Sequence, residues 1–233
     1  MAERTPQDPA TGDVLLLGAS GLVGGYCLSA LAARPEVRRI YVPLREGSQV
    51  DGPKVHAIPF DFDDPDCYRD LPAVEAVFCC LGLPLDRLKD RDALYRVDYA
   101  YPIAVARRYK DAVSLFSVVT SVGISRWSPL YYCRIKARLE AELVALRFPA
   151  LHLFQPSLLL GLRTGIHPWQ QWFQAALGPR RGWFFGPLSR FRPVAAETLA
   201  QAMVAHWPAA AQGTSRLYAP QIERLASAAA PES

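Results

Sequence analysis

The sequence predicts an α/β protein with a Rossmann-like, doubly wound parallel sheet and a small C-terminal substrate subdomain. Short apolar runs alternate with helical patterns of about 10 to 15 residues between positions 14 and 161, which is typical of parallel βαβ units. A glycine-rich motif separates the first apolar run from the first helical pattern. The chain has 233 residues, 51% of them apolar, which is enough to bury the core of one ordinary domain.

The individual elements follow from these patterns. Apolar runs predict six strands at residues 14–17, 39–44, 54–60, 74–81, 113–120 and 151–155, with a further short strand at 216–219. Helices are predicted at 22–33, 98–110, 130–148 and 195–206, and Asp98 is expected to be the N-cap of the second helix. We expect a flexible tail at 1–12, a single domain at 13–220 with a substrate or lid insertion at 161–195, and a C-terminal helix or frayed tail at 221–233.

Charge and cysteine content exclude several classes of protein. The net charge is only +4 and no basic run is long, so we expect no nucleic-acid partner. Five cysteines without CxxC spacing argue against a disulfide framework or a zinc ribbon, and four scattered histidines predict no metal site. Residues 14–33 are uncharged, as in a membrane span or secretory signal, but acidic residues precede them and four glycines interrupt them. The sequence therefore predicts a cytoplasmic monomer or homodimer without a membrane span.

The glycine-rich motif connects the first strand to the first helix, and it consists of Gly18, Ala19, Ser20, Gly21, Leu22, Val23 and Gly24. Glycines at this spacing let the backbone turn sharply and approach a pyrophosphate, whose charge the helix N-terminus stabilises. Glycines alone are a weak signal, since they also serve helix packing. In this position within an α/β chain, however, the motif predicts a dinucleotide-binding site.

The end of the second strand indicates which dinucleotide is bound. NAD sites place an acidic residue there for the ribose 2′-hydroxyl, whereas NADP sites place an arginine there for the 2′-phosphate. Arg45 reaches this position first, and Glu46 follows it. We therefore expect NADP(H) rather than NAD(H). The alternative is that Arg45 and Glu46 form a solvated pair with no ligand.

A second group of residues suits proton transfer. Tyr132 and Lys136 are four residues apart, and so share one face of the predicted helix. Because a tyrosine hydroxyl titrates at about pH 10, a nearby cation is needed to lower its pKa. Ser121 follows the fifth strand, at the sheet edge where ligands bind, and its hydroxyl suits a substrate carbonyl. We predict that these three residues are catalytic; alternatively, Tyr132 is a core residue and Lys136 is solvated.

With these residues, the chain resembles an atypical short-chain dehydrogenase/reductase, and it is similar to the NADPH-binding oxidoreductases related to the human Tat-interacting protein. The matching stretches are residues 18–24, 61–62, 77–82, 96–98, 120–123 and 130–142. The resemblance implies that residues 18–24 bind the pyrophosphate and that Arg45 binds the 2′-phosphate. It also implies that Asp61 and Phe62 contact the adenine, and that Leu81 and Gly82 line the ribose.

The resemblance implies hydride transfer between NADP(H) and a small carbonyl or alcohol substrate, with Tyr132 as the acid/base. Two departures from the family pattern bear on this chemistry. The chain contains no asparagine, and Asp98 stands where the relay asparagine of the superfamily is sought. Pro156 and Ser157 stand where Pro-Gly is frequent. An NADPH-binding regulatory or scaffold protein and an NAD(P)-dependent epimerase are therefore alternatives. The aromatic and basic stretch 163–192 suits a substrate lid, a partner surface or a packed core.

Overall fold

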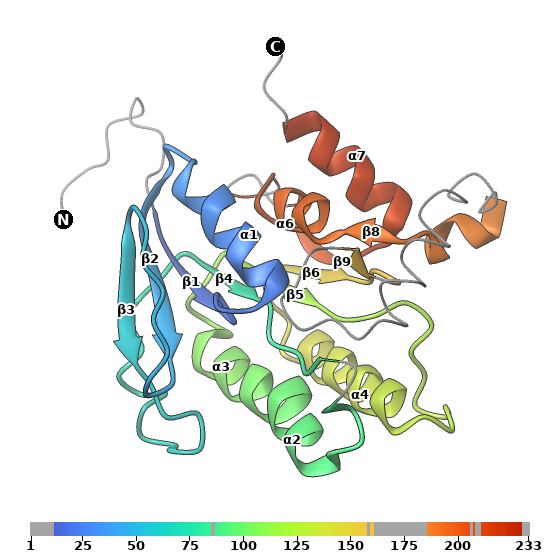
Figure 1. Cartoon of the computed structure of the whole chain (residues 1–233), viewed down its shortest axis with the longest axis horizontal. Coiled ribbons are helices and arrows are strands. Elements are labelled where there is room, and N and C mark those ends of the chain that lie inside the picture. Colours follow the sequence, from blue (N-terminus) through green and yellow to red (C-terminus); the bar gives the residue numbers. More distant parts are fainter. Residues whose placement is uncertain are drawn as a thin grey trace.

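The computed structural model describes residues 12–84, 87–157, 159–160, 186–205, 207 and 211–229. Its central feature is a seven-stranded parallel sheet with the order β3-β2-β1-β4-β5-β6-β9 (Figure 1). The strands are β1 (Gly12–Leu17), β2 (Val37–Leu44), β3 (Val55–Pro59), β4 (Ala76–Cys79), β5 (Leu115–Val119), β6 (Ala150–Phe154) and β9 (Gly213–Leu217). The predicted doubly wound α/β fold is confirmed.

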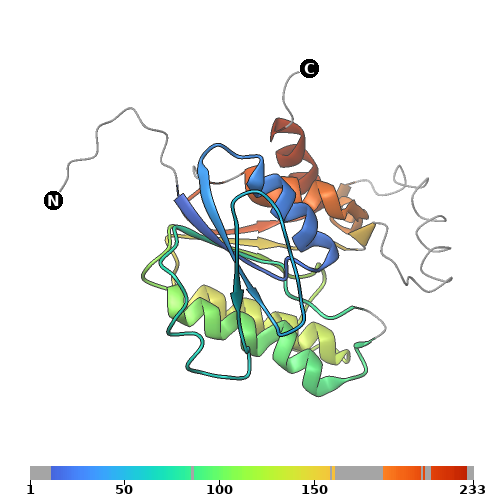
Figure 2. The same cartoon turned by 60° about the vertical axis from the view of Figure 1, so that its left-hand side comes forward.

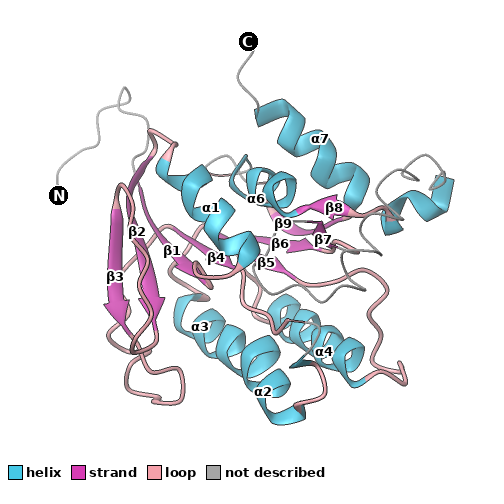
Figure 3. Cartoon of the chain, in the orientation of Figure 1, coloured by secondary structure: helices cyan, strands magenta, loops and turns pink. Residues whose placement is uncertain are grey.

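Helices cover both faces of this sheet (Figures 2 and 3). One layer contains α1 (Leu22–Ala32), α6 (Ala196–Ala205) and α7 (Ala219–Ala229), and the other contains α2 (Arg91–Tyr95), α3 (Tyr101–Tyr109) and α4 (Tyr131–Ala145). Strand β1 shows why both layers form, because side chains alternate along a strand. Val14 and Leu16 pack with the first layer, whereas Leu15 and Leu17 pack with the second. All six residues of β1 are therefore buried.

The strand order places a crevice beside the carboxyl end of β1. The chain runs from β1 outward to β2 and β3, and then crosses back to form β4 on the other side of β1. At such a switch point the connections leave the sheet in opposite directions, which opens a binding crevice. The segments after β1, β2 and β4 meet there.

The helical region before β5 begins earlier than predicted. Helix α2 starts at Arg91, and the side chain of Asp90 caps it by accepting a hydrogen bond from the Ala93 N–H at 3.0 Å. A π-helical segment, η2 (Arg96–Ala100), connects α2 to α3. Asp98 lies inside η2, and its side chain is turned to a different partner described below. The prediction that Asp98 caps this helix is therefore wrong.

The C-terminal part adds a small second sheet of two parallel strands, β7 (Leu159–Leu160) and β8 (Val194–Ala195). A 3₁₀ segment, η4 (Gly186–Phe191), precedes β8. Residues 161–185, which include most of the aromatic and basic stretch, lie outside the described residues. Among the residues described, no helix has the length and apolar character needed to cross a bilayer.

Candidate functional site

The glycine-rich turn lies between β1 and α1, as predicted. Gly18 has a φ of +78°, which side-chain-bearing residues rarely adopt, and a Cβ there would lie 2.9 Å from the Cys80 carbonyl oxygen. A Cβ on Gly24 would lie 1.9 Å from the Gly18 carbonyl oxygen. These two glycines therefore let α1 start directly against the ends of β1 and β4. No side chain caps α1, so its first N–H groups are available to an anion.

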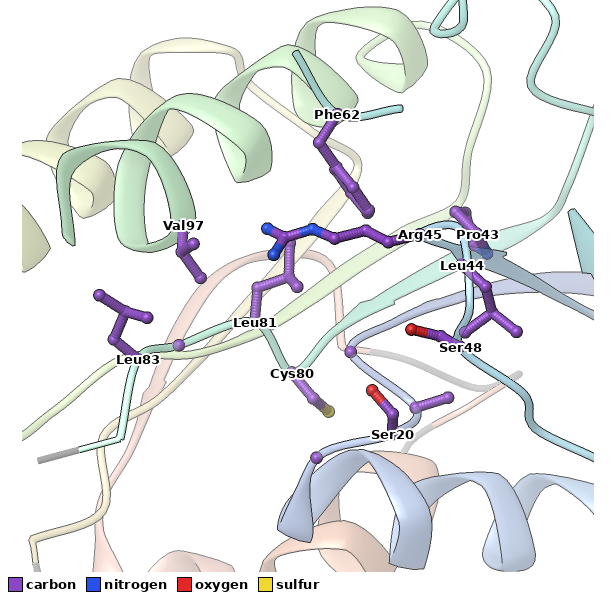
Figure 4. Close-up of a pocket in the computed structure, with 14 residues that line it drawn as sticks. Ser20, Pro43, Leu44, Arg45, Ser48, Phe62, Cys80, Leu81, Leu83 and Val97 are labelled. Atoms are coloured by element: carbon purple, nitrogen blue, oxygen red, sulfur yellow. The ribbon is translucent and has the colours of Figure 1, made fainter. Parts of the chain in front are cut away.

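A cavity of about 250 Å³ opens next to this uncapped helix end (Figure 4). Gly18, Ala19, Ser20 and Gly21 form one wall. The other lining residues come from the end of β2, from the segments after β2, β3 and β4, and from η2, and they are Pro43, Leu44, Arg45, Ser48, Phe62, Cys80, Leu81, Gly82, Leu83 and Val97. Of the predicted binding residues, the structure thus brings eight together around one cavity. Leu22, Val23 and Gly24 lie in the first turn of α1, behind this wall.

A second cavity of about 870 Å³ adjoins the first and shares Arg45, Phe62, Leu83 and Val97 with it. Asp61 lines this second cavity together with Arg87, Arg96, Tyr101 and others. The shared lining residues make one continuous groove along the carboxyl edge of the sheet.

Arg45 extends across the junction of the two cavities. Its side chain passes between Phe62 and Leu81 (Figure 4). The guanidinium carbon lies 5.7 Å from the centroid of the Phe62 ring and 5.8 Å from that of the Tyr101 ring. Among the described residues, no ion pair joins Arg45 to Glu46. The guanidinium is therefore held by aromatic rings inside the groove.

Phe62 and its neighbours form the wall opposite the glycine turn. Phe62 is buried and packs against Phe60 and Tyr101. The Tyr101 hydroxyl donates to Asp63 Oδ1 at 2.8 Å, which joins α3 to the segment after β3. Asp61 Oδ1 accepts from the Asp63 N–H at 2.9 Å and so stiffens this turn. The wall is an apolar surface with a polar rim, and both parts suit a purine ring.

Lys136 lies behind this groove, on α4, and is buried. Its Nζ forms an ion pair with Asp98 Oδ1 at 2.9 Å, and it donates to the Val119 carbonyl at 3.4 Å. A Cβ on Gly82 would lie 3.5 Å from Asp98 Oδ1 and 3.9 Å from Lys136 Nζ. Gly82, a lining residue of the smaller cavity, thus separates the groove from the ion pair. Burial lowers the pKa of Lys136, but the Asp98 charge and Tyr132 raise it above the usual value.

Tyr132 and Ser121 complete the predicted group. Both are half-buried, and a hydrogen bond with Ser121 lowers the pKa of Tyr132. Burial has the largest effect and raises the pKa of Tyr132; Lys136 lowers it and Asp98 raises it again. Lys136 therefore lowers this pKa as expected, but the larger effect of burial makes the net direction upward. Neither residue lines the two cavities described above.

Sequence reasoning missed a buried polar cluster next to this group. Glu140, one turn after Lys136 on α4, accepts through Oε1 from Thr120 Oγ1 and from Gln155 Nε2, both at 2.6 Å. Its Oε2 lies 3.5 Å from Arg216 Nε. The cluster fixes α4 against the ends of β5, β6 and β9. The only signal in the sequence is that Glu140 follows Lys136 by four residues, which indicates the same helix face and no partner.

Ser157 and the residues after η4 lie near Ser121. The Ser157 hydroxyl donates to the Phe191 carbonyl at 2.7 Å and to the Arg192 carbonyl at 3.1 Å. A Cβ on Gly123 would lie 3.7 Å from the Phe191 ring. The serine that replaces the frequent glycine therefore attaches the segment 191–192 to the end of β6. The rest of the aromatic and basic stretch up to residue 185 lies outside the described residues.

Comparison with known sequences finds relatives that carry the name FMP52. No protein-family model matches the sequence. The chain is 30% identical over 156 residues to "Protein FMP52, mitochondrial" of Meyerozyma guilliermondii, covering 66% of this chain and 67% of that protein. It is 26% identical over 204 residues to the protein of the same name of Lodderomyces elongisporus, covering 82% and 84% of the two chains. Because these relatives are named mitochondrial, the expectation of a cytoplasmic protein is wrong.

Solved structures with the same fold have little sequence in common with this chain. The Bordetella bronchiseptica enzyme WbmF in complex with NAD⁺ superposes with a TM-score of 0.67 at 14% identity, over 95% of this chain and 78% of that one. MoeE5 in complex with UDP-glucose and NAD has a TM-score of 0.65 at 16% identity, over 93% and 81%. UDP-glucose 4-epimerase of Thermotoga maritima has a TM-score of 0.64 at 12% identity, over 93% and 82%. These likenesses show that the chain shares the Rossmann-like fold of these proteins.

Proposed function

The chain belongs to the FMP52 family of proteins, and from this premise we propose that it is an oxidoreductase that uses NADP(H) to reduce a small carbonyl compound. One observation carries the proposal. The uncapped N-terminus of α1 and the guanidinium of Arg45 face the same groove at the switch point of the sheet. A helix N-terminus stabilises a pyrophosphate, and an arginine at the end of the second strand suits a 2′-phosphate.

The residues of the groove fit a dinucleotide in order along its length. Residues 18–24 bind the pyrophosphate in this proposal, because the backbone there approaches the cavity without side chains. Arg45 binds the 2′-phosphate, and Phe62 with Asp61 receives the adenine. Leu81 and Gly82 lie toward the ribose on the nicotinamide side, since Gly82 borders the Asp98–Lys136 pair. The fold of WbmF and MoeE5, both solved with a bound nicotinamide dinucleotide, supports this placement.

The chemistry follows from the group behind the groove. When bound, the dinucleotide supplies the hydride that the substrate carbon accepts. Ser121 donates a hydrogen bond to the substrate oxygen and polarises the carbonyl, and Tyr132 gives its hydroxyl proton to the same oxygen. Lys136 then stabilises the tyrosinate by its charge. Ser157 holds the end of η4 beside this group through its hydrogen bonds to the Phe191 and Arg192 carbonyls.

Two other functions are compatible with the same site. An NAD(P)-dependent epimerase is favoured by the fold likeness to UDP-glucose 4-epimerase of Thermotoga maritima, solved with UDP-glucose. Such an enzyme would turn over without net consumption of NADPH. A regulatory protein that binds NADPH would show neither substrate turnover nor NADPH consumption.

The name of the relatives supports a mitochondrial location for this chain, which a fluorescent fusion imaged with a mitochondrial dye would test.

The test of the proposed function is a titration with NADPH and NADH that follows nicotinamide fluorescence. We expect wild type to bind NADPH more tightly than NADH. Arg45→Ala removes a hydrogen bond to a charged group, so its affinity for NADPH should fall by about 10- to 100-fold, with a smaller change for NADH. Arg39→Ala, an exposed arginine on the same strand, is the control and should bind like wild type. Failure of wild type to bind either nucleotide would overturn the proposal.

A further inference from the structure

The ion pair between Asp98 and Lys136 is the most buried charge pair among the described residues. The two side chains are 1% and 4% exposed, and Asp98 Oδ1 lies 2.9 Å from Lys136 Nζ. Burying two charges costs more than their attraction returns unless further hydrogen bonds satisfy them. A fold of this kind could place an apolar pair here at lower cost. The pair is therefore more simply explained by a role in the site than by stability.

The contacts of Asp98 connect Lys136 to the wall of the groove. Asp98 Oδ2 accepts from the Leu83 N–H at 2.8 Å, and Leu83 lines both cavities. Gly82, next to Leu83, lies between the cavity and the ion pair, since a Cβ there would be 3.5 Å from Asp98 Oδ1 and 3.9 Å from Lys136 Nζ. On the other side, Lys136 Nζ donates to the Val119 carbonyl at the end of β5. The ammonium is thus fixed between the ends of β4 and β5.

The backbone around Asp98 is adapted to this contact. Asp98 is the middle residue of η2, where the helix between α2 and α3 is wider than an α-helix. Single π-turns of this kind are rare, and they occur frequently at functional sites because they change the direction of one side chain. Here Asp98 is buried, whereas Arg96 in the same turn is exposed at the rim of the larger cavity.

The groups that face Tyr132 come from three elements. Lys136 and Cys133 are on its own helix, Asp98 is on η2, and Ser121 follows β5. The Cys79 thiol of β4 lies near both charges, and burial raises its pKa to about 12, so it is neutral. Among the described residues, the charged groups that shift the pKa of Tyr132 are Lys136 and Asp98, and their charged atoms are 2.9 Å apart.

We propose that Asp98 is a positioning residue that holds the Lys136 ammonium at the wall of the groove and compensates its charge, so that Tyr132 stays protonated and serves as the proton donor. The proton passes from Tyr132 Oη to the carbonyl oxygen while the carbonyl carbon accepts the hydride. The C=O π bond breaks, C–H and O–H bonds form, and the dinucleotide is oxidised. The part of this inference that concerns the reaction rests on the proposed function. The part that concerns the effect of Asp98 on Lys136 and Tyr132 does not.

The electrostatic part is tested on the cofactor-free protein by NMR titration of tyrosine labelled with ¹³C at Cζ. Tyr132→Phe identifies the Tyr132 signal by its loss. In Asp98→Asn, the titration midpoint of Tyr132 should move to lower pH, because Lys136 is no longer compensated. Asp13→Asn is the matched control, since Asp13 is a buried carboxylate paired with Arg38 at 2.8 Å at the start of β1. It should leave the midpoint unchanged even if the melting temperature falls.

A second pair of variants gives the answer if Asp98→Asn does not fold. Lys136→Met removes the cation alone and should move the midpoint to higher pH. The double variant Asp98→Asn/Lys136→Met leaves no buried charge without a partner, and its midpoint should lie closer to wild type than that of Lys136→Met. Equal midpoints in these two variants, or an unchanged midpoint in folded Asp98→Asn, would overturn the proposal. Because no nucleotide is present, failure of dinucleotide binding is a separate result that only the fluorescence titration reports.

Discussion

The Cα of Gly24 lies so close to the carbonyl oxygen of Gly18 that a Cβ on Gly24 would be 1.9 Å from that oxygen. The contact is between two backbones, so no side chain can rotate away to relieve it. The substitution Gly24→Ala should therefore lower the free energy of unfolding by about 3 kcal/mol or more, measured by urea denaturation. It should also weaken nucleotide binding, because α1 must move away from β1.

Gly25→Ala is the control for this substitution. The nearest atom to a Cβ there is the Ala19 carbonyl oxygen at 3.7 Å, an ordinary contact distance. Since alanine is a better helix former than glycine, the free energy of unfolding should rise by up to about 1 kcal/mol. Equal losses in the two variants would show that the close approach of Gly24 to Gly18 does not limit the packing of α1.

Tyr132→Phe should remove turnover and keep nucleotide binding. The phenol is the proton donor in the proposed reaction, and loss of such a donor costs about 10² to 10⁴ in rate. The measurement is NADPH consumption with a carbonyl that wild type reduces, alongside the fluorescence titration. Tyr131→Phe is the neighbouring control, since the Tyr131 ring packs against Arg91 and Arg134 away from this group. Full activity of Tyr132→Phe would exclude the phenol as the acid.

Glu140→Ala should destabilise the fold strongly, because the buried Gln155 amide would lose its acceptor and Thr120 would keep only its longer hydrogen bond to the Phe154 carbonyl at 3.3 Å. We expect the free energy of unfolding to fall by about 2–4 kcal/mol. Glu197→Ala, at an exposed position in the first turn of α6, should cost about 1 kcal/mol or less. Urea denaturation of both variants checks the comparison, and similar losses would contradict the role given to the Glu140 cluster.

Stability should decline at alkaline pH because several tyrosines are buried. Burial raises the pKa of Tyr109, and it raises the pKa of Tyr99 to about 12 with help from Glu142. Their unfolded-state pKa is about 10. Above that pH the unfolded chain loses protons that the native state keeps, so this contribution to stability is full below pH 10 and is lost as pH rises.

Urea denaturation at pH 8 to 11 tests the alkaline decline. Tyr109→Phe should be less stable than wild type at pH 8, because the hydroxyl donates to the Pro72 carbonyl at 2.6 Å. Its stability should then fall less steeply above pH 10. Tyr26→Phe, at a position that is 37% exposed, should follow the wild-type slope. If the stability of Tyr109→Phe falls with pH as steeply as that of wild type, other groups cause the decline.

The sequence was sufficient for the features that depend on local pattern. The glycine turn, the strand ends and the helix that carries Tyr132 and Lys136 all follow from spacing and composition within short windows. Residues such as Arg45 and Ser121 were placed at one sheet edge because parallel strands end on the same side. This reasoning predicts which residues lie at the same edge of the sheet. It does not predict which side chains form hydrogen bonds or ion pairs with each other.

The partners depend on contacts between distant parts of the chain. Asp98 and Lys136 are 38 positions apart, and nothing in either segment indicates the other. The sequence predicts Asp98 as a helix cap because aspartate favours that position, but Asp90 is the residue that caps α2. Asp98 instead pairs with the buried ammonium of Lys136. The pKa of Tyr132 rises because burial raises it more than Lys136 lowers it, and the local Tyr-Lys spacing gives no sign of that burial.

The order of the elements along the chain also sets the order in which the two parts of the proposed site are synthesised. Among the described residues, those that line the two cavities all lie before position 102. They come from the ends of β2 and β3, from the segments after β1, β2, β3 and β4, and from α2, η2 and the start of α3. Ser121, Tyr132 and Lys136 leave the ribosome later. Until then Asp98 has no cation beside it and must stay hydrated. In the proposed function, the nucleotide-binding residues are thus synthesised before the catalytic ones, and the ion pair of Asp98 with Lys136 forms only when the second half of the sheet is added to the first.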